Sequence, residues 1–321
     1  MKTTLYLLLI FANSLSLFSQ NIHKFVIGNG PEDFVLDTFS STQRLIVSCH
    51  ERRDKVKKKI SYFYSVDINF REAAKMIRMN EPDNFYLNLI GIDIEKFNDK
   101  IFLYATSHFK DEYMVVKYQV KEDSLFFIRY YSNPFFYKLN DVAVFKGNFI
   151  VSNCKYFNGS IAYCDSLGNC KKLLSHIDFP NGVYFENDST FYYSSTFENS
   201  FVKNSIKDLT VTQSQKIAKI KGADNILKCN GKFYITSHPN FIKFMQHKKT
   251  AEKKSPIAVF EYDGNTTVLK KIYTNEGELI SAVSSAVIYK NNLYLSQIFD
   301  DFILQINLAD SNPPTINSSK K

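Results

Sequence analysis

The chain of 321 residues is long enough for one large domain or two ordinary ones. A hydrophobic fraction of 45% allows a sizeable core, and 29 Phe and 20 Tyr favour strands, because aromatic side chains suit half-buried pleated surfaces. Much of the formal charge of +8 lies in two segments, 52–59 and 243–254. Neither segment interleaves its basic residues with an aromatic stacking platform, which argues against a nucleic-acid partner. We expect solvated loops there, with weak association to an anionic surface as the alternative.

The first twenty residues have the order of an export signal. Lys2 supplies a positive start, the stretch from Leu5 to Leu17 is mostly apolar, and the small residue Ser19 follows. The apolar stretch is shorter than the about 20 residues that a membrane span needs, and no later stretch is apolar enough. We therefore expect a signal peptide at residues 1–20 and a secreted or periplasmic protein. The alternative is a retained N-terminal helix that is buried or serves as an anchor.

Short strand patterns recur along the rest of the chain, separated by turn clusters such as Lys146-Gly147 and Asn230-Gly231. Such turn residues between alternating apolar runs are typical of β-hairpins. Helical periodicity is weak throughout, and the best short candidate is Phe70–Met79. We expect strands at Phe34–Leu36, Arg44–Ser48, Ile60–Val66, Ile101–Ala105, Tyr113–Val120, Asp141–Phe145, Asn148–Ser152, Thr190–Ser194, Lys232–Thr236, Ile257–Tyr262 and Asn292–Ser296.

A looser repeat places a small or polar residue pair before an apolar strand, a turn and a second strand. The second residues of successive pairs are 58, 50, 41, 43 and 60 residues apart, which gives six units of the size of a propeller blade. The sequence therefore predicts an all-β fold, a six-bladed β-propeller that forms a single domain over residues 21–308. Lys24–Ile27 is expected to close the ring by pairing near Ile303–Leu308, and residues 309–321 are expected to form a flexible tail. The pairs are Glu32-Asp33, Ile90-Gly91, Asn140-Asp141, Asn181-Gly182, Asp224-Asn225 and Ser284-Ser285.

Four of the six pairs carry acids or amides, and each pair is expected to begin the innermost strand of its blade. These side chains would then converge on the central channel, where several buried acids would repel one another. A calcium ion would remove this cost, because it takes about six to eight oxygen ligands from carboxylates, amides, carbonyls and water. The alternative is that Asp and Asn stand there because they commonly start strands and turns. The residues are Glu32, Asp33, Asn140, Asp141, Asn181, Asp224 and Asn225.

In order and spacing, these motifs resemble the paraoxonase/arylesterase family over essentially the whole stretch from Asn21 to Leu308. Gluconolactonase and strictosidine-synthase-like propellers share the architecture, but the paired motifs are more similar to those of paraoxonases. The resemblance implies a six-bladed propeller with two stacked calcium ions in a central calcium-binding channel, and hydrolysis of small-molecule lactones or aryl esters. It rests on Gly30-Pro31-Glu32-Asp33, Leu139-Asn140-Asp141, Asn181-Gly182, Asp224-Asn225 and Ser237-His238-Pro239-Asn240.

The resemblance also implies two sets of calcium ligands. Each set contains two carboxylates and is therefore formally neutral with Ca²⁺ bound. The structural ion would be held by Asp33, Asp141 and the backbone carbonyl of Ile92. The catalytic ion would be held by Glu32, Asn140, Asn181, Asp224 and Asn225.

The sequence departs from the family in the residues that would activate water. The family has a His before the Gly of the second unit, but this chain has Ile90, which cannot accept a proton. The second His of that dyad corresponds to His108, either a catalytic residue or a structural histidine. Lys155 stands where the family has a third His, whereas His238 is retained and is expected to orient groups near the metal.

The five cysteines are an odd number for an exported protein, so at least one is unpaired. Cys164 and Cys170 flank a turn-like segment, which leaves a disulfide between them open. By the resemblance, the disulfide that joins the first and last strands of the family is replaced here by Ile22 and Ile306. We therefore expect the ring to close by packing.

Two functional hypotheses follow. The first is a calcium-dependent hydrolase of lactones or aryl esters, in which Glu32 or Asp224 assists the attacking water without the missing His. The second is a non-catalytic exported propeller that keeps both ions for stability and uses its loops to bind a ligand or partner, since a fold does not fix a function. The identity of residue 90 separates the two most directly.

Overall fold

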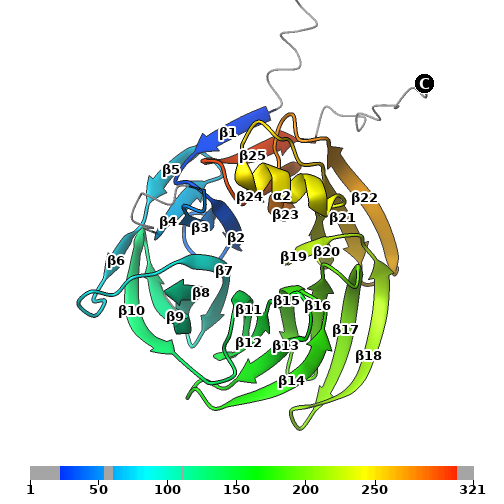
Figure 1. The fold of residues 1–321 in the computed structure, drawn as a ribbon. Coiled ribbons are helices and arrows are strands. Elements are labelled where there is room, and N and C mark those ends of the chain that lie inside the picture. Colours follow the sequence, from blue (N-terminus) through cyan, green and yellow to red (C-terminus); the bar gives the residue numbers. More distant parts are fainter. Residues whose placement is uncertain (1–21, 54–60, 110–111, 309–321) are drawn as a thin grey trace, which may run out of the picture.

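The computed structural model describes residues 22–53, 61–109 and 112–308, and these residues form six β-sheets around a central axis (Figure 1). This arrangement confirms the predicted all-β fold and the six-bladed β-propeller. Within the described ranges, no helix is both long and apolar enough to cross a membrane. The expected signal peptide at 1–20 and tail at 309–321 lie outside the described residues.

The first strand of each blade lines the channel, and later strands lie progressively closer to the rim (Figure 1). A short strand, β6 (Ile77–Met79), adds a parallel fifth strand to the outer edge of the second blade. The other strands of the first three blades are β2 (Pro31–Asp37), β3 (Arg44–His50), β4 (Ser61–Asp67) and β5 (Glu72–Lys75); β7 (Leu89–Phe97), β8 (Lys100–Phe109), β9 (Glu112–Lys121) and β10 (Ser124–Tyr131); and β11 (Leu139–Phe145), β12 (Asn148–Asn153), β13 (Gly159–Cys164) and β14 (Cys170–Ile177).

The last three blades repeat the same order from the axis outwards, and the sixth takes its outermost strand from the start of the chain. Their strands are β15 (Pro180–Asn187), β16 (Thr190–Ser195), β17 (Ser200–Lys207) and β18 (Thr210–Lys219); β19 (Ala223–Cys229), β20 (Lys232–Ser237), β21 (Ile257–Asp263) and β22 (Val268–Asn275); and β23 (Val283–Tyr289), β24 (Asn292–Gln297), β25 (Phe302–Asn307) and β1 (Ile22–Val26). All eleven predicted strands fall within these elements over their described residues.

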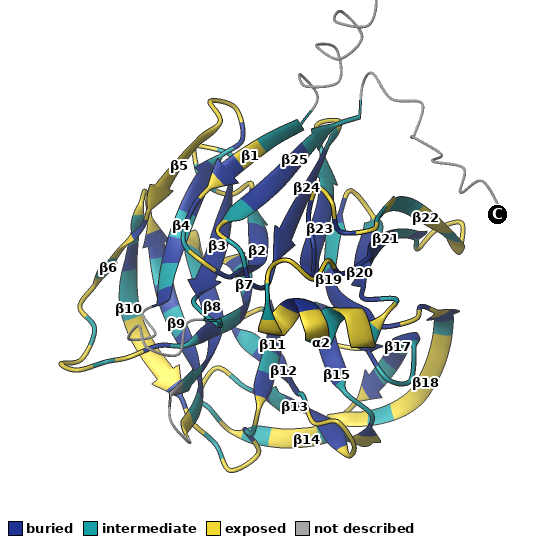
Figure 2. Cartoon of the chain, turned by 45° about the horizontal axis from the view of Figure 1, so that its top comes forward, coloured by how far each residue is buried: buried dark blue, intermediate teal, exposed yellow. Residues whose placement is uncertain are grey.

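The hydrophobic core lies mainly between neighbouring blades, and the surface of the outer strands is exposed (Figure 2). Phe63 of β4 packs edge-to-face on Tyr118 of β9, with ring centroids 5.7 Å apart. Phe201 of β17 and Phe233 of β20 meet in a tilted arrangement three blades further on, at 5.6 Å. Because this packing fixes each blade against the next, it also fixes where the inner strands point on the axis.

All six predicted residue pairs lie near the start of the innermost strands β2, β7, β11, β15, β19 and β23. At each pair the register with the second strand shifts, for example between Pro31 and Asp33 or between Pro180 and Val183. A bulge of this kind interrupts the ladder and re-aims side chains. The repeated pair is therefore the point at which every blade turns polar groups towards the channel.

The first and last strands close the ring as predicted. β1 pairs antiparallel with β25 and places Ile22 opposite Ile306. Both side chains pack against the core of the sixth blade. Packing of two isoleucines thus holds the closure at the positions where the resemblance places the family's disulfide.

The segment Phe70–Met79, predicted to be helical, instead contains the strands β5 and β6. Arg71 has a φ of 58°, in the left-handed region, and this conformation does not continue a right-handed helix. All four residues of β5 are exposed, so its sequence does not carry the apolar alternation of a half-buried strand (Figure 2). The outer edge of the blade therefore lacks the pattern on which strand prediction depends.

The helix α2 (Phe241–Lys249) crosses the face of the propeller and was not predicted (Figure 2). The side chain of Asn240 caps it by accepting a hydrogen bond from the backbone N–H of Lys243 at 3.0 Å. Only His247 is buried, so the helix has no strong apolar stripe. The basic segment 243–254, expected to be a solvated loop, therefore begins in a helix.

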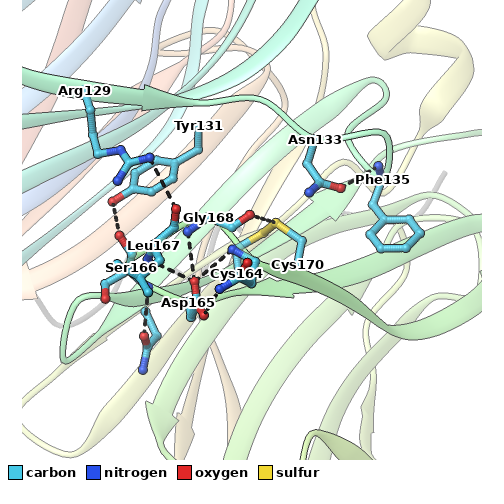
Figure 3. Close-up of a disulfide and its surroundings, with 12 residues drawn as sticks. Arg129, Tyr131, Asn133, Phe135, Cys164, Asp165, Ser166, Leu167, Gly168 and Cys170 are labelled. Atoms are coloured by element: carbon cyan, nitrogen blue, oxygen red, sulfur yellow. Dashed lines mark hydrogen bonds between the residues drawn. A yellow bond between two sulfur atoms is a disulfide. The ribbon is translucent and has the colours of Figure 1, made fainter.

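A disulfide joins Cys164 and Cys170 across the β13–β14 turn (Figure 3). Inside the turn, the carboxylate of Asp165 accepts backbone N–H groups from Leu167 and Gly168, both at 2.9 Å. The disulfide that the sequence left open is therefore present, and it closes a turn that is already well hydrogen-bonded.

An engineered disulfide between β1 and β25 can test the ring closure. The Ile22→Cys/Ile306→Cys variant should form a disulfide, because these residues are direct antiparallel partners. It should stabilise the protein by about 2–4 kcal/mol, since it constrains the unfolded chain. The melting temperature with and without reductant measures this, with Ile22→Cys alone as the control. Equal melting temperatures in both conditions would show that these strands do not hold the ring together.

Candidate active site

A cavity of about 370 Å³ lies over the start of the inner strands, at the end of the channel that α2 faces. We call it the upper cavity. Ile90, His108 and His238 contribute to its wall. Asn225 is not part of the wall but follows Asp224 directly in β19. The other four residues expected to hold the catalytic calcium all line it: Glu32, Asn140, Asn181 and Asp224.

Two amide oxygens of this group are buried and uncommitted, which means that they accept no hydrogen bond from the described residues. The Nδ2 of Asn181 donates to Thr196 Oγ1 at 3.1 Å and also to Asp224. The Nδ2 of Asn225 donates to Ser285 Oγ at 3.0 Å. The Oδ1 atoms of both asparagines have no hydrogen-bond partner among the described residues. Buried acceptors without a partner are costly, and amide oxygens are ligands that a hard cation such as Ca²⁺ prefers.

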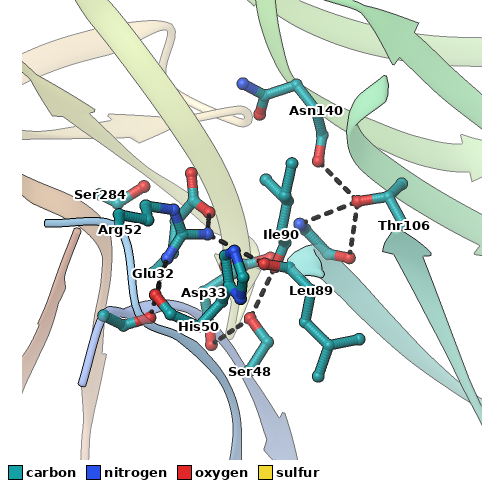
Figure 4. A network of polar contacts seen from close by, with 12 residues as sticks. Glu32, Asp33, Ser48, His50, Arg52, Leu89, Ile90, Thr106, Asn140 and Ser284 are labelled. Carbon is teal, nitrogen blue, oxygen red and sulfur yellow. Dashed lines mark hydrogen bonds and ion pairs between the residues drawn. The ribbon is translucent and has the colours of Figure 1, made fainter. Parts of the chain in front are cut away.

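Glu32 forms an ion pair with Arg52 (Figure 4). Burial raises the pKa of the Glu32 carboxyl, and the positive charge of Arg52 opposes that rise. The same guanidinium donates to three backbone carbonyls, those of Gly30 at 3.1 Å and of His50 and Leu89 at 2.9 Å each. Arg52 is thus a fixed part of the wall of the upper cavity.

The sequence interpretation of Arg52 was wrong. The run that it begins was expected to be a solvated loop, but the Arg52 side chain is only 16% exposed. Nothing in a run of basic residues shows which one turns inwards. The signal that could have found it is the acid of the first unit, Glu32, because β2 pairs with β3 and Arg52 lies two residues beyond the end of β3.

His238 and Asp224 form a carboxylate–histidine pair. The Nε2 of His238 lies 2.8 Å from the Oδ2 of Asp224, and both side chains are almost fully buried. The ring of Phe244 packs on the imidazole, with centroids 4.4 Å apart. The Nδ1 of His238 is buried and has no partner among the described residues. His238 therefore orients Asp224 in the wall, and its expected role beside a metal stays a prediction.

His108 lies in the cavity wall but is held by the backbone. Its Nε2 is 2.6 Å from the carbonyl oxygen of Leu139, so this nitrogen carries the proton that is donated. The ring also packs against Tyr113, with centroids 5.2 Å apart. The apolar side chain of Ile90 lines the same cavity, where the resemblance would place the other His of the dyad.

A further histidine, His50, lines the upper cavity and was missed. The Ser61 hydroxyl accepts the backbone N–H of Leu89 at 3.0 Å and lies 3.0 Å from the Nδ1 of His50. His50 ends a fully buried strand, β3, in which a histidine resembles an ordinary satisfied core residue.

The expected structural set lines a second cavity of about 340 Å³, which we call the lower cavity. Asp33 accepts the backbone N–H of Ile92, and Asp141 accepts that of Val183, both at 2.8 Å. Burial raises the pKa of Asp33 to about 7, and burial together with the charge of Asp33 raises that of Asp141. Asp33, Ile92 and Asp141 are therefore brought together, as predicted.

A third acid of the lower cavity, Asp93, was not predicted. Its Oδ2 accepts the backbone N–H of Val144 from the next blade at 2.7 Å. Burial raises its pKa to about 7 as well. A single acid inside an alternating strand normally points to solvent, so no sequence pattern placed Asp93 on the channel side.

One side of the upper cavity is aromatic. The rings form a continuous series in which Tyr156 and Phe197 stack at 5.7 Å, Phe197 meets Phe241 at 5.1 Å, and Phe241 stacks on Phe244 at 5.9 Å. Tyr156, Phe241 and Phe244 line the cavity directly, together with Phe299. An apolar wall beside converging polar groups is the usual composition of a small-molecule site.

The donor chemistry of both sets fits calcium, although the ion itself remains a prediction. In the part of the chain that the structure describes, no group of three or more His, Cys, Asp or Glu side chains is placed to hold a metal ion. Each expected set has only two carboxylates, and amide or backbone oxygens make up the rest. The uncommitted Oδ1 atoms of Asn181 and Asn225 are the observation that favours a cation in the upper set.

Two glycines allow neighbouring blades to bring these residues together. A methyl group on Gly91 would lie 2.6 Å from the Cα of Asp141. One on Gly182 would lie 2.7 Å from the Cα of Asn225 and 2.8 Å from the carbonyl oxygen of Asp224. Such distances are too short for any side chain, so the second and fourth units carry glycine where other units carry an acid, an amide or a serine.

Comparison with known proteins shows the family to which the chain belongs. The arylesterase family model matches residues 55–304, and the chain belongs to that family. The luciferin-regenerating enzyme matches with a TM-score of 0.56 at 12% identity, over 89% of this chain and 94% of that one. Virginiamycin B lyase from Staphylococcus aureus matches with a TM-score of 0.51 at 11% identity, over 89% and 99%. At these identities the two structures support the fold alone. No curated protein matches.

The close approach at Gly182 yields a stability prediction. Gly182→Ala should destabilise the protein by about 1–3 kcal/mol, because the added methyl overpacks against the β19 backbone. Gly264→Ala is the matched control, since its nearest atoms lie 3.8 and 3.9 Å away. Urea denaturation of both variants measures the difference. Equal unfolding midpoints would mean that the blades can move apart at no cost.

Proposed function

We propose that this protein is an exported, calcium-dependent hydrolase of lactones or aryl esters. The observation that carries the proposal is the set of convergent carboxylate and uncommitted amide oxygens beside an aromatic wall in the upper cavity. Membership of the arylesterase family supports the ester-hydrolase part of it.

The residues that would hold two ions are those of the two cavities. Glu32, Asn140, Asn181, Asp224 and Asn225 would hold the catalytic calcium. Asp33, Asp141 and the Ile92 carbonyl would hold the structural one. When bound, calcium supplies a Lewis acid that polarises an ester carbonyl.

The remaining chemistry falls to side chains of the upper cavity. The oxygen of water bonds to the ester carbonyl carbon, and Glu32 takes its proton. The ester C–O bond then breaks, and the proton passes to the departing alkoxide or phenoxide. Glu32 is favoured over Asp224 as the base because Asp224 is engaged by two side chains, His238 and Asn181, whereas Glu32 is paired with Arg52. Burial raises the pKa of Glu32, which suits a base near neutral pH.

The aromatic wall would hold the apolar part of the substrate. Tyr156, Phe241 and Phe244 offer ring faces beside the polar groups. An aryl group or a lactone with an apolar chain could stack there and exclude water from the scissile bond.

Glu32 and the divalent ion can be tested together. Chelation should abolish hydrolysis of phenyl acetate and of a lactone panel, and added calcium should restore it. Glu32→Gln should lower the rate about 100-fold or more, because it removes the base and one ligand. Glu261→Gln is the control, since Glu261 pairs with Lys232 outside both cavities. Unchanged activity in Glu32→Gln would overturn the site, and no ester hydrolysis by calcium-loaded protein would overturn the enzyme.

A non-catalytic propeller is the second candidate, and one observation favours it. Ile90 stands in the upper cavity where the family's dyad would have a His, and His108 is committed to the Leu139 carbonyl. In that case both ions would stabilise the fold, and the cavity would bind a ligand without turning it over.

Restoring the dyad separates the two candidates. Ile90→His should raise ester hydrolysis about tenfold or more, because it adds a general base beside His108. Combining it with His108→Ala should remove the gain. A gain from measurable wild-type activity supports the enzyme with a weaker base. Activity that exists only in Ile90→His supports the non-catalytic propeller.

A further inference from the structure

Arg52 places a positive charge of the chain itself at the carboxylate expected to bind a metal. Its guanidinium pairs with Glu32 and is held by the carbonyls of Gly30, His50 and Leu89 (Figure 4). A divalent cation would need the same carboxylate and would meet the guanidinium at short range. Like charges repel strongly where both are screened from water.

We propose that Arg52 is a built-in counter-cation that competes with the divalent cation for Glu32. The upper cavity therefore binds its ion more weakly than it would without Arg52. This inference rests on the proposed function, because it takes the upper set as a cation site.

The lower cavity has no comparable competitor among the described residues. Asp33 accepts hydrogen bonds from the backbone N–H groups of Phe34 and Ile92 and from the Ser285 hydroxyl. Asp141 accepts hydrogen bonds from the backbone N–H groups of Val142 and Val183. Lys228 lines this cavity, but its ammonium is paired with Glu186. The lower acids are thus compensated by neutral donors, whereas Glu32 in the upper cavity is paired with a side-chain cation.

Arg52 also has a role when no metal is bound. Glu32 is nearly buried, and a buried charge without a partner is strongly destabilising. The guanidinium supplies that partner. Removal of Arg52 should therefore have two opposite effects. It should tighten cation binding, and it should make the metal-free fold less stable.

Calorimetric titration of metal-stripped protein with CaCl₂ tests the binding half. Wild type should show a tight and a weak event, with the weak event lost in Glu32→Gln. Arg52→Gln should tighten the weak event at least about tenfold, or about 1.4 kcal/mol, and leave the tight one unchanged. Arg53→Gln is the charge-matched control, because Arg53 pairs with Asp300 instead.

A weak event that is unchanged or absent in Arg52→Gln overturns the inference, as does equal tightening in Arg53→Gln. These outcomes are independent of catalysis. If calcium binds as predicted but no ester is cleaved, the proposed function fails and the competition stands. If neither event occurs in wild type, both fail.

Thermal melting tests the stability half. In chelator, Arg52→Gln should melt several degrees below wild type, and saturating CaCl₂ should close that gap. A gap of the same size in both conditions would identify Arg52 as an ordinary structural residue and overturn the competition.

Discussion

The compensation of buried negative charge on the propeller axis is the constraint on which the rest of the structure depends. Four blades bring an acid or amide of their pair to the channel, so acids from different blades lie within one low-dielectric space, where isolated charges are costly. In the lower half, backbone N–H groups of the next blade compensate Asp33 and Asp141. In the upper half, Arg52 and His238 compensate Glu32 and Asp224. The lower acids therefore depend on a neighbouring blade for a partner, whereas the upper acids take theirs from their own blade.

The bulges explain how one blade supplies a hydrogen-bond donor to the acid of its neighbour. Where the register of an inner strand shifts, the backbone N–H just after the bulge turns to the neighbouring blade instead of its own ladder. The N–H of Ile92 reaches Asp33, and that of Val183 reaches Asp141. On the other side of the same strands, Gly91 and Gly182 allow the close approach of β11 and β19. The candidate ligands thus also fasten one blade to the next, so fold and site share the same residues.

The sequence contained the repeat, the ring closure and the candidate ligands, because each depends on residue types at fixed intervals. The contribution of Arg52 could not be predicted, since a basic run shows charge but no direction. Asp93 was missed because an acid in an alternating strand normally faces solvent. The strands in Phe70–Met79 were missed because the blade edge is exposed, so its residues need no apolar alternation. The Cys164–Cys170 disulfide needed the hairpin register. Arg52 and Asp93 were missed because the direction of a side chain is set by tertiary packing.

Ile90 and Arg52 lie in the wall of the same cavity, and their effects on Glu32 are linked. With an aliphatic residue at position 90, activation of water falls to Glu32. Burial raises the pKa of that carboxyl, whereas Arg52 opposes the rise and keeps more of it ionised. The guanidinium therefore favours Glu32 as a base while it weakens Glu32 as a metal ligand. Because these effects oppose each other, the rate of hydrolysis alone cannot reveal the role of Arg52, and the affinity for the cation must be measured separately.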